Sequence, residues 1–224
     1  FNKIVMGGTR VDKGNSEQIG DSNLTITGGT FESQIVGGMT YAGSDLRGQA
    51  ILTGDVNLTI TGGEFKSWIS GGSVSTATPG NTLVDGDITI TIDASSNEIT
   101  FDKDAHIVAG SYQNGVVDGR TKVVFKGLSE NLHMNANNLV WGGSNADYYS
   151  NKADGRDFVT AVYGDRTDDD RTDGYRTDGD RTVSFDAFSG DFTARIRGFN
   201  TLDAVNGAEV TALAGDLSDI EFWN

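Results

Sequence analysis

Apolar and polar residues alternate in short segments that recur along the chain. In one of them Val56, Leu58 and Ile60 alternate with Asn57 and Thr59. Successive side chains of a β-strand point to opposite faces, so this alternation predicts a strand with one apolar face. Each segment begins at a glycine, and the segments that share the pattern are 20–27, 54–61, 86–93, 119–126 and 179–186.

The segments also align with one another without gaps. Their fifth residue is apolar in every copy and is Leu24, Leu58, Ile90, Val123 or Val183. The leading glycines follow one another at intervals of about 33 residues, apart from a last interval of about 60. A second apolar column precedes paired or nearly paired glycines in the segments 5–8, 35–38, 69–72, 108–110 and 140–143. Self-similarity at this period is typical of repeat proteins, in which one unit cannot bury its own apolar face.

The repeat predicts an all-β fold, a parallel β-helix (β-solenoid) with about 5–6 coils of about 33 residues. We expect a single domain over residues 1–224, with an insertion loop at about 144–178 and divergent terminal coils at about 187–224. The fifth-residue column should form one interior file. Phe1, Lys3 and Val5 fit the second column, so we interpret the N-terminus as a cut through a longer stack. Helical periodicity is nearly absent, and only 202–220 would tolerate a helix.

The variable segments all follow the second glycine pair of a repeat, which predicts that they line one edge of the stack. We call this the loop edge, and it comprises 9–19, 39–53, 73–85, 111–118 and 144–178. Loops on a rigid scaffold commonly carry binding sites. The tyrosines assigned to this edge are candidate binding residues for a glycan or a protein: Tyr41, Tyr112, Tyr148, Tyr149 and Tyr175. Equally, they could anchor the loops to the scaffold.

The amino-acid composition limits the kinds of stabilising links and partners that the chain can have. The chain has 31 glycines, one proline and no cysteine, which fits thin coils with tight turns and excludes disulfides. No segment reaches the ~18 apolar residues of a membrane-spanning helix. The formal net charge of −15 argues against nucleic acid or an anionic membrane as a partner and favours a neutral or basic partner or divalent cations.

A period of five residues marks 165–182, where arginine, threonine and aspartate recur. Ca²⁺ prefers six to eight oxygen ligands on a flexible loop, so the aspartates of this run are a candidate calcium site. They are Asp168, Asp170, Asp173, Asp178 and Asp180. Their spacing is not that of an EF-hand, and the interleaved arginines would compete for the carboxylates. The alternative is a solvated, self-neutralising loop without any cofactor.

The sequence favours a protein that is not an enzyme. A β-helix enzyme that processes polysaccharides would need a carboxylate pair or a carboxylate–Ca²⁺ site on an outer strand face. The outward strand positions are mainly asparagine, threonine and lysine, and neither His106 nor His133 has a nucleophile beside it in the pattern. We expect both histidines to be surface residues or satisfied turn residues.

The repeat Gly54 to Phe65, followed by Trp68 to Gly72, resembles the passenger repeats of autotransporter-type adhesins, which are large bacterial surface proteins. The segments 198–202 and 215–220 are similar in style to spacer coils of such proteins. The resemblance implies a right-handed β-helix and a secreted, extracellular protein on the bacterial cell surface. It implies an adhesive or spacer role, with a host or neighbouring-cell glycan, a surface protein or another copy as partner. The alternatives are a polysaccharide-processing enzyme and a self-assembling filament subunit.

Overall fold

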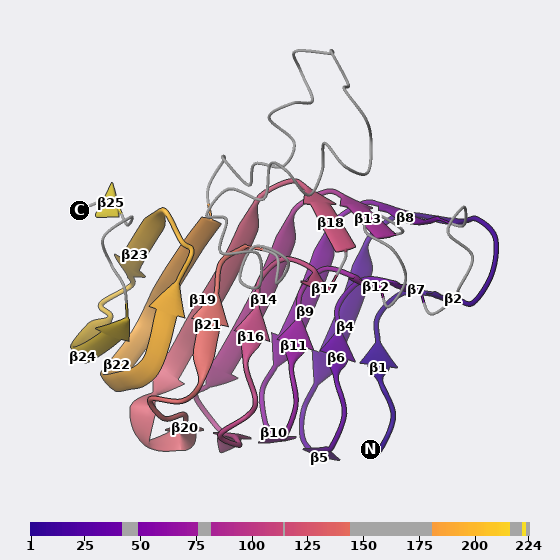
Figure 1. The fold of residues 1–224 in the computed structure, drawn as a ribbon. Coiled ribbons are helices and arrows are strands. Elements are labelled where there is room, and N and C mark those ends of the chain that lie inside the picture. The colour runs from indigo at the N-terminus through magenta and orange to yellow at the C-terminus, as the bar shows by residue number, and fades with distance from the viewer. Residues whose placement is uncertain (42–48, 76–81, 114, 144–180, 216–220, 223–224) are drawn as a thin grey trace.

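Short parallel strands from successive repeats lie side by side in the structure, a computed structural model (Figure 1). It describes residues 1–41, 49–75, 82–113, 115–143, 181–215 and 221–222. The fold is all-β with parallel sheets, as the alternation predicts, and the only helical turn among the described residues is the 3-10 turn η1 (Ser129–Asn131). Within these ranges no helix is long and apolar enough to cross a membrane.

The predicted repeats pair with one another in register. We call the strands of the alternating segments the first ladder, which comprises β4 (Ser22–Ile26), β9 (Val56–Ile60), β14 (Ile88–Ala94) and β19 (Thr121–Leu128). Leu24 pairs with Leu58, Leu58 with Ile90, Ile90 with Val123, and Val123 with Val183 of the next strand. The predicted interior file is therefore confirmed.

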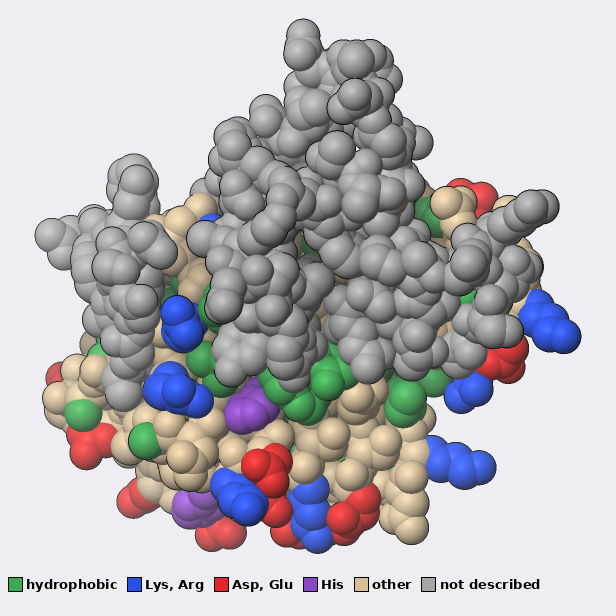
Figure 2. Space-filling model, in the orientation of Figure 1, with side chains coloured by type: hydrophobic (Ala, Val, Ile, Leu, Met, Phe, Trp, Pro, Cys, Tyr) green, Lys and Arg blue, Asp and Glu red, His purple; other side chains and the backbone are tan. Residues whose placement is uncertain are grey.

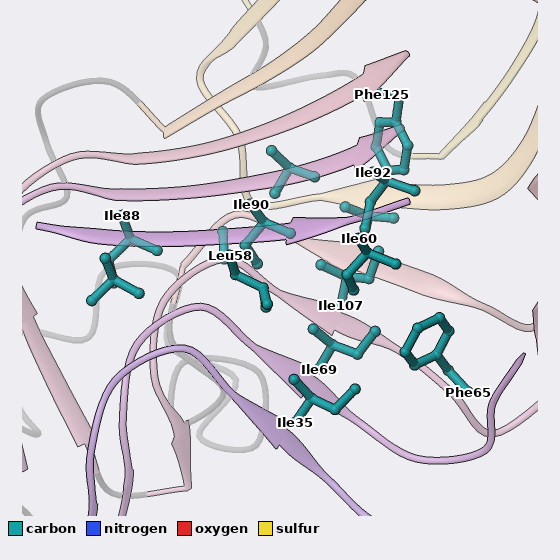
Figure 3. Packing of buried hydrophobic residues seen from close by; sticks show 14 of the residues in the cluster. Ile35, Leu58, Ile60, Phe65, Ile69, Ile88, Ile90, Ile92, Ile107 and Phe125 are labelled. Atoms are coloured by element: carbon teal, nitrogen blue, oxygen red, sulfur yellow. The ribbon is translucent and has the colours of Figure 1, made fainter. Parts of the chain in front are cut away.

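A second ladder faces the first across the core. It comprises β1 (Val5–Met6), β6 (Ile35–Val36), β11 (Ile69–Ser70), β16 (Ile107–Val108) and β21 (Leu139–Trp141). Ile35, Ile69 and Ile107 point inward toward Leu58, Ile90 and their neighbours on the first ladder, as Figure 3 shows. Except at the first repeat, the inward side chains are almost completely buried. The core is thus a continuous apolar column between the two ladders.

A third row of parallel strands stacks phenylalanine on phenylalanine. Its strands are β5 (Thr30–Phe31), β10 (Gly63–Phe65), β15 (Ile99–Phe101) and β20 (Leu132–His133). The ring centroids of Phe1, Phe31, Phe65 and Phe101 follow one another at 4.8, 5.2 and 5.4 Å. The placement of Phe1 and Val5 in the column of the later repeats is confirmed by the Phe1–Phe31 stack and by the pairing of Val5 with Ile35.

The prediction that the loop edge consists of loops is wrong for most of its described residues, because they form two further parallel sheets. One sheet comprises β2 (Arg10–Val11), β7 (Thr40–Tyr41), β12 (Val74–Ser75) and β17 (Tyr112–Gln113). The other comprises β3 (Ser16–Ile19), β8 (Ala50–Thr53), β13 (Thr82–Asp85) and β18 (Gly115–Asp118). A strand of two residues is too short to show alternation in the sequence. Such a segment becomes a strand because it pairs with the equivalent segment of the next repeat.

Contacts between neighbouring repeats explain two recurring features of the sequence, the glycine pairs and the aspartates that follow the leading glycines. A Cβ on Gly71 would lie directly against the carbonyl oxygen of Ala109 and 2.5 Å from Ile88 Cγ2, so this turn needs glycine. The aspartates after the first three leading glycines bridge repeats. Asp21 Oδ1 accepts the Asp55 N–H at 3.0 Å, and Asp55 Oδ1 accepts the Asp87 N–H at 2.9 Å. We call this row the aspartate ladder.

The C-terminal region is less regular. β22 (Arg181–Arg197) pairs with β19 through its first half and with β21 through Arg195–Arg197, so it joins the two ladders into one sheet. It is followed by β23 (Thr201–Val205), β24 (Glu209–Gly215) and β25 (Glu221–Phe222). No strand of the first ladder deviates from register before β19, whereas β22 shows shifts against β19 and β24. The predicted insertion loop 144–178 lies outside the described residues.

Candidate functional site

The structure separates the five candidate tyrosines. Tyr41 lies in β7, paired with Val11 and Ser75, and is 0% exposed. Its assignment to an exposed binding loop is therefore wrong, because its strand turns it into the core. Tyr112 in β17 is half-buried and remains at the surface. Tyr148, Tyr149 and Tyr175 lie outside the described residues, and so do all the aspartates of the candidate calcium site, Asp168, Asp170, Asp173, Asp178 and Asp180.

Tyr112 belongs to an aromatic cluster on the outer side of the second ladder. The Trp68 ring centroid lies 4.8 Å from that of Tyr112 and 4.5 Å from that of His106, which it meets edge to face. The three residues come from positions before β11, before β16 and within β17, and Ile69 pairs with Ile107 so that Trp68 stands next to His106. Equivalent positions on consecutive repeats thus bring Trp68 and His106 together, and Tyr112 joins them from the neighbouring sheet, where it pairs with Val74.

His106 is anchored by the next repeat. Its Nδ1 accepts the backbone N–H of Leu139 at 3.1 Å, which places the proton of the neutral ring on Nε2. Partial burial, and then the positive charge of Arg195, lower the pKa of His106 below its ordinary value of 6.5, while Asp104 acts in the opposite direction. The ring is therefore neutral near pH 7. The expectation of a satisfied histidine is confirmed.

Two arginines continue the same outer surface onto β22. Leu139 pairs with Arg195 and Trp141 pairs with Arg197, so both guanidinium groups follow the aromatic residues in the stacking direction. The Arg197 guanidinium carbon lies 5.9 Å from the Trp141 ring centroid. Both arginine side chains are exposed. We call Trp68, His106, Tyr112, Trp141, Arg195 and Arg197 the aromatic–arginine face.

Figure 2 shows apolar side chains gathered beside a histidine, with lysine or arginine side chains close by on the same view of the molecule. The chemistry available on the aromatic–arginine face is that of binding, since it offers ring surfaces, an N–H donor and guanidinium donors. Within the ranges that the structure describes, no three His, Cys, Asp or Glu side chains lie close enough together to hold a metal ion.

Trp68 packs against His106 and Tyr112. The sequence pattern does not single out Arg195 or Arg197 as site residues. The arginines follow the aromatic residues only because β22 extends as far as the second ladder and pairs with β21. No local sequence pattern predicts this pairing.

No family model matches the chain, and neither a curated protein nor a solved structure matches it.

Proposed function

We propose that the chain is a right-handed β-solenoid of the bacterial cell surface or extracellular space, with an adhesive or spacer role and no enzymatic activity. The observation that carries the proposal is the in-register file from Leu24 to Val183, because each repeat buries its apolar face only against the next. Such a stack is a long, rigid support for lateral binding surfaces. Handedness and surface location come from the resemblance to autotransporter-type adhesin repeats.

The binding surface in this proposal is the loop edge together with the adjoining aromatic–arginine face. Tyr112 lies at the border of the two, in β17 and against Trp68. The partner is a glycan or surface protein of a host or neighbouring cell, or a second copy of the chain. A binding role also agrees with the outward residues of the first ladder, such as Asn23, Asn57 and Thr59, which lack the grouped carboxylates of a glycosidase.

Binding and stability can be separated by neutralising the charges of 144–178 through Asp→Asn and Arg→Gln substitutions. Adhesion of the variant to immobilised glycans and to intact cells should fall, while its thermal unfolding midpoint should stay near that of the wild type. A matched control neutralises the surface pair Lys66 and Glu32, which lies outside both surfaces and should change neither quantity appreciably. Equal loss of adhesion and stability would contradict the loop edge, and no adhesion of the wild type to any surface would contradict the function.

Surface display has its own test. The genomic reading frame that contains the chain should encode an export signal before it and an outer-membrane barrel or wall anchor after it. A frame that encodes neither, in a protein found by fractionation in the cytoplasm, would contradict the proposed location.

A further inference from the structure

The aromatic–arginine face has an unusual charge arrangement for so acidic a chain. The net charge is −15, and several described cations are paired with carboxylates, among them Lys66 with Glu32 at 2.7 Å and Lys126 with Asp186 at 2.6 Å. Arg195 and Arg197 form no ion pair among the described residues, although both are exposed. Two guanidinium groups without a carboxylate, next to aromatic rings, call for an explanation.

The contacts that these two arginines do make leave most of their donors available. Arg195 Nη2 donates a long hydrogen bond of 3.4 Å to the Asn137 carbonyl oxygen, and Arg197 lies over the Trp141 ring. A guanidinium group has five N–H donors in a planar fork that fits a carboxylate. Arg195 pairs with Leu139, which stands next to His106 on the ladder, and Arg197 pairs with Trp141, so an oligosaccharide that extends along the ladder from the rings reaches both forks.

We infer that the aromatic–arginine face binds an acidic oligosaccharide whose pyranose rings carry carboxylates, as in uronic acids. The ring of Trp68, which packs against Tyr112, offers a flat apolar surface for the C–H face of a sugar, and His106 Nε2 offers a donor to a hydroxyl. Arg195 and Arg197 bind the carboxylates through charge-assisted hydrogen bonds. This inference rests on the proposed binding function and specifies its ligand.

The ligand is an exception to the overall charge, which favours neutral or basic partners. The exception is physically consistent because ions in solution screen the repulsion between the ligand and the acidic residues elsewhere on the chain. The Debye length is about 8 Å at physiological ionic strength, so distant carboxylates act weakly on a ligand held against two guanidinium groups. Asp104 opposes the arginines at His106, but two guanidinium groups outweigh this one carboxylate and decide the sign of the interaction at this face.

The ligand test compares two forms of one sugar. Isothermal titration calorimetry of the whole chain should detect binding of a hexuronate oligosaccharide, and the same oligosaccharide with methyl-esterified carboxylates should bind at least about tenfold more weakly. The ester keeps the rings and hydroxyls, removes the charge and adds one methyl group to each carboxyl. Equal affinity for the two forms, or binding to neither, would overturn the inference.

Variants assign the binding to the face. The double substitution Arg195→Gln and Arg197→Gln should weaken binding of the acid by at least about tenfold and leave binding of the ester unchanged. Trp68→Ala should weaken both forms. Arg120→Gln is the matched control, because it removes an exposed arginine that pairs with Asp87 and lies outside both the loop edge and the aromatic–arginine face, and it should bind like the wild type. Circular dichroism and thermal unfolding of each variant establish that it is folded.

Wild-type affinity in the folded arginine double variant would place the ligand elsewhere and overturn the inference. If the chain adheres to neutral glycans or surface proteins but not to the uronate, the inference fails and the proposed function stands. If it adheres to no surface and binds no sugar, both fail.

Discussion

The first three repeats and the region from β22 to β24 are held together in different ways. In the first ladder, residues stack on their equivalents without a register shift from β4 to β14, and the aspartate ladder bonds each repeat to the next. In the C-terminal region the register shifts against both β19 and β24, and Ala187 adopts a positive φ of 51°. Regular pairing therefore holds only part of the C-terminal end, since Thr182 to Asp186 pair in register with β23 whereas the pairing with β24 is shifted.

Side-chain packing holds the C-terminal region together where its strand pairing is shifted. Phe125, Phe185, Phe188 and Phe192 form a buried cluster in which Phe185 contacts each of the others at centroid distances between 5.1 and 5.8 Å. In the regular repeats the backbone geometry leaves room only for glycine at some turns, whereas in the C-terminal region large rings fill the space that irregular backbone leaves. One apolar column is therefore continued in two ways, by repeated in-register strand pairing in the regular repeats and by packing of phenylalanine rings in the C-terminal region.

The largest effect should come from removing a ring of the phenylalanine cluster. Phe185→Ala deletes the shared contact of the cluster and should lower the free energy of unfolding by about 3–5 kcal/mol in urea titration. Because contacts in a stack are mainly between neighbours, the loss should be regional. Hydrogen exchange followed by mass spectrometry should show faster exchange in β19, β22 and β24, with β4, β8 and β9 unchanged.

The control for this regional effect is Phe65→Ala in the regular phenylalanine row, which contacts Phe31 and Phe101 instead. Its faster exchange should centre on β10 and the neighbouring strands β5 and β15. Uniform acceleration across the chain in both variants would show that the two regions unfold as one unit, and the comparison would lose its energetic meaning.

A second prediction concerns the glycine turns of the regular region. Gly71→Ala places a methyl group against the Ala109 carbonyl oxygen and Ile88 Cγ2, both of which are held in the stack, and should cost about 2–4 kcal/mol of unfolding free energy. The matched control is Gly28→Ala, whose added Cβ would have no atom within 4 Å. Equal stability of the two variants would show that close backbone approach does not constrain the repeats.

The sequence reveals the regular region because its signals repeat. Leu58 is informative only together with Leu24 and Ile90, which occupy the same place one interval away, and the structure pairs them. The glycine pairs are informative in the same way. The all-β fold and the parallel pairing could therefore be predicted from the spacing of a few residue types.

The site could not be predicted to the same extent. Thr40 and Tyr41 form a two-residue strand whose burial depends on the neighbouring repeats, so the local sequence predicts a loop for Tyr41 although it lies in the core. Arg195 meets the second ladder only through the length of β22. A contact between distant segments that occurs only once leaves no recurring pattern in the sequence, so it cannot be predicted in this way.

A smaller effect is expected in the aspartate ladder. Asp55→Ala removes the acceptor of the Asp87 N–H and should cost about 0.5–1.5 kcal/mol, because an exposed hydrogen bond is partly replaced by water. Asp55→Asn keeps an oxygen acceptor at the same position and should retain most of the stability. If Asp55→Asn loses as much as Asp55→Ala in urea titration, the carboxylate charge and not the hydrogen bond stabilises the turn.

The smallest effect should appear at His106, where the two regions meet. Its ring accepts the Leu139 N–H of the next repeat and lies near Arg195 of β22. Since the folded-state pKa of His106 is lowered, the unfolded chain binds the proton more tightly. The resulting stabilisation is complete above the ordinary pKa of 6.5 and is lost as the pH falls below it, where protonation of the unfolded state pulls the equilibrium.

Urea titrations at pH values from 8 to 5 should therefore show a fall in stability that His106→Gln reduces, because glutamine has no proton to gain in this range. The exposed His133 provides the control, and His133→Gln should keep the wild-type pH dependence around His106. The protection factor of the Leu139 amide, which corrects exchange for its intrinsic pH dependence, should fall toward the acid end in the wild type, because a doubly protonated ring no longer accepts its N–H. A protection factor that stays constant down to pH 5 would show that the junction between the two regions does not depend on the histidine.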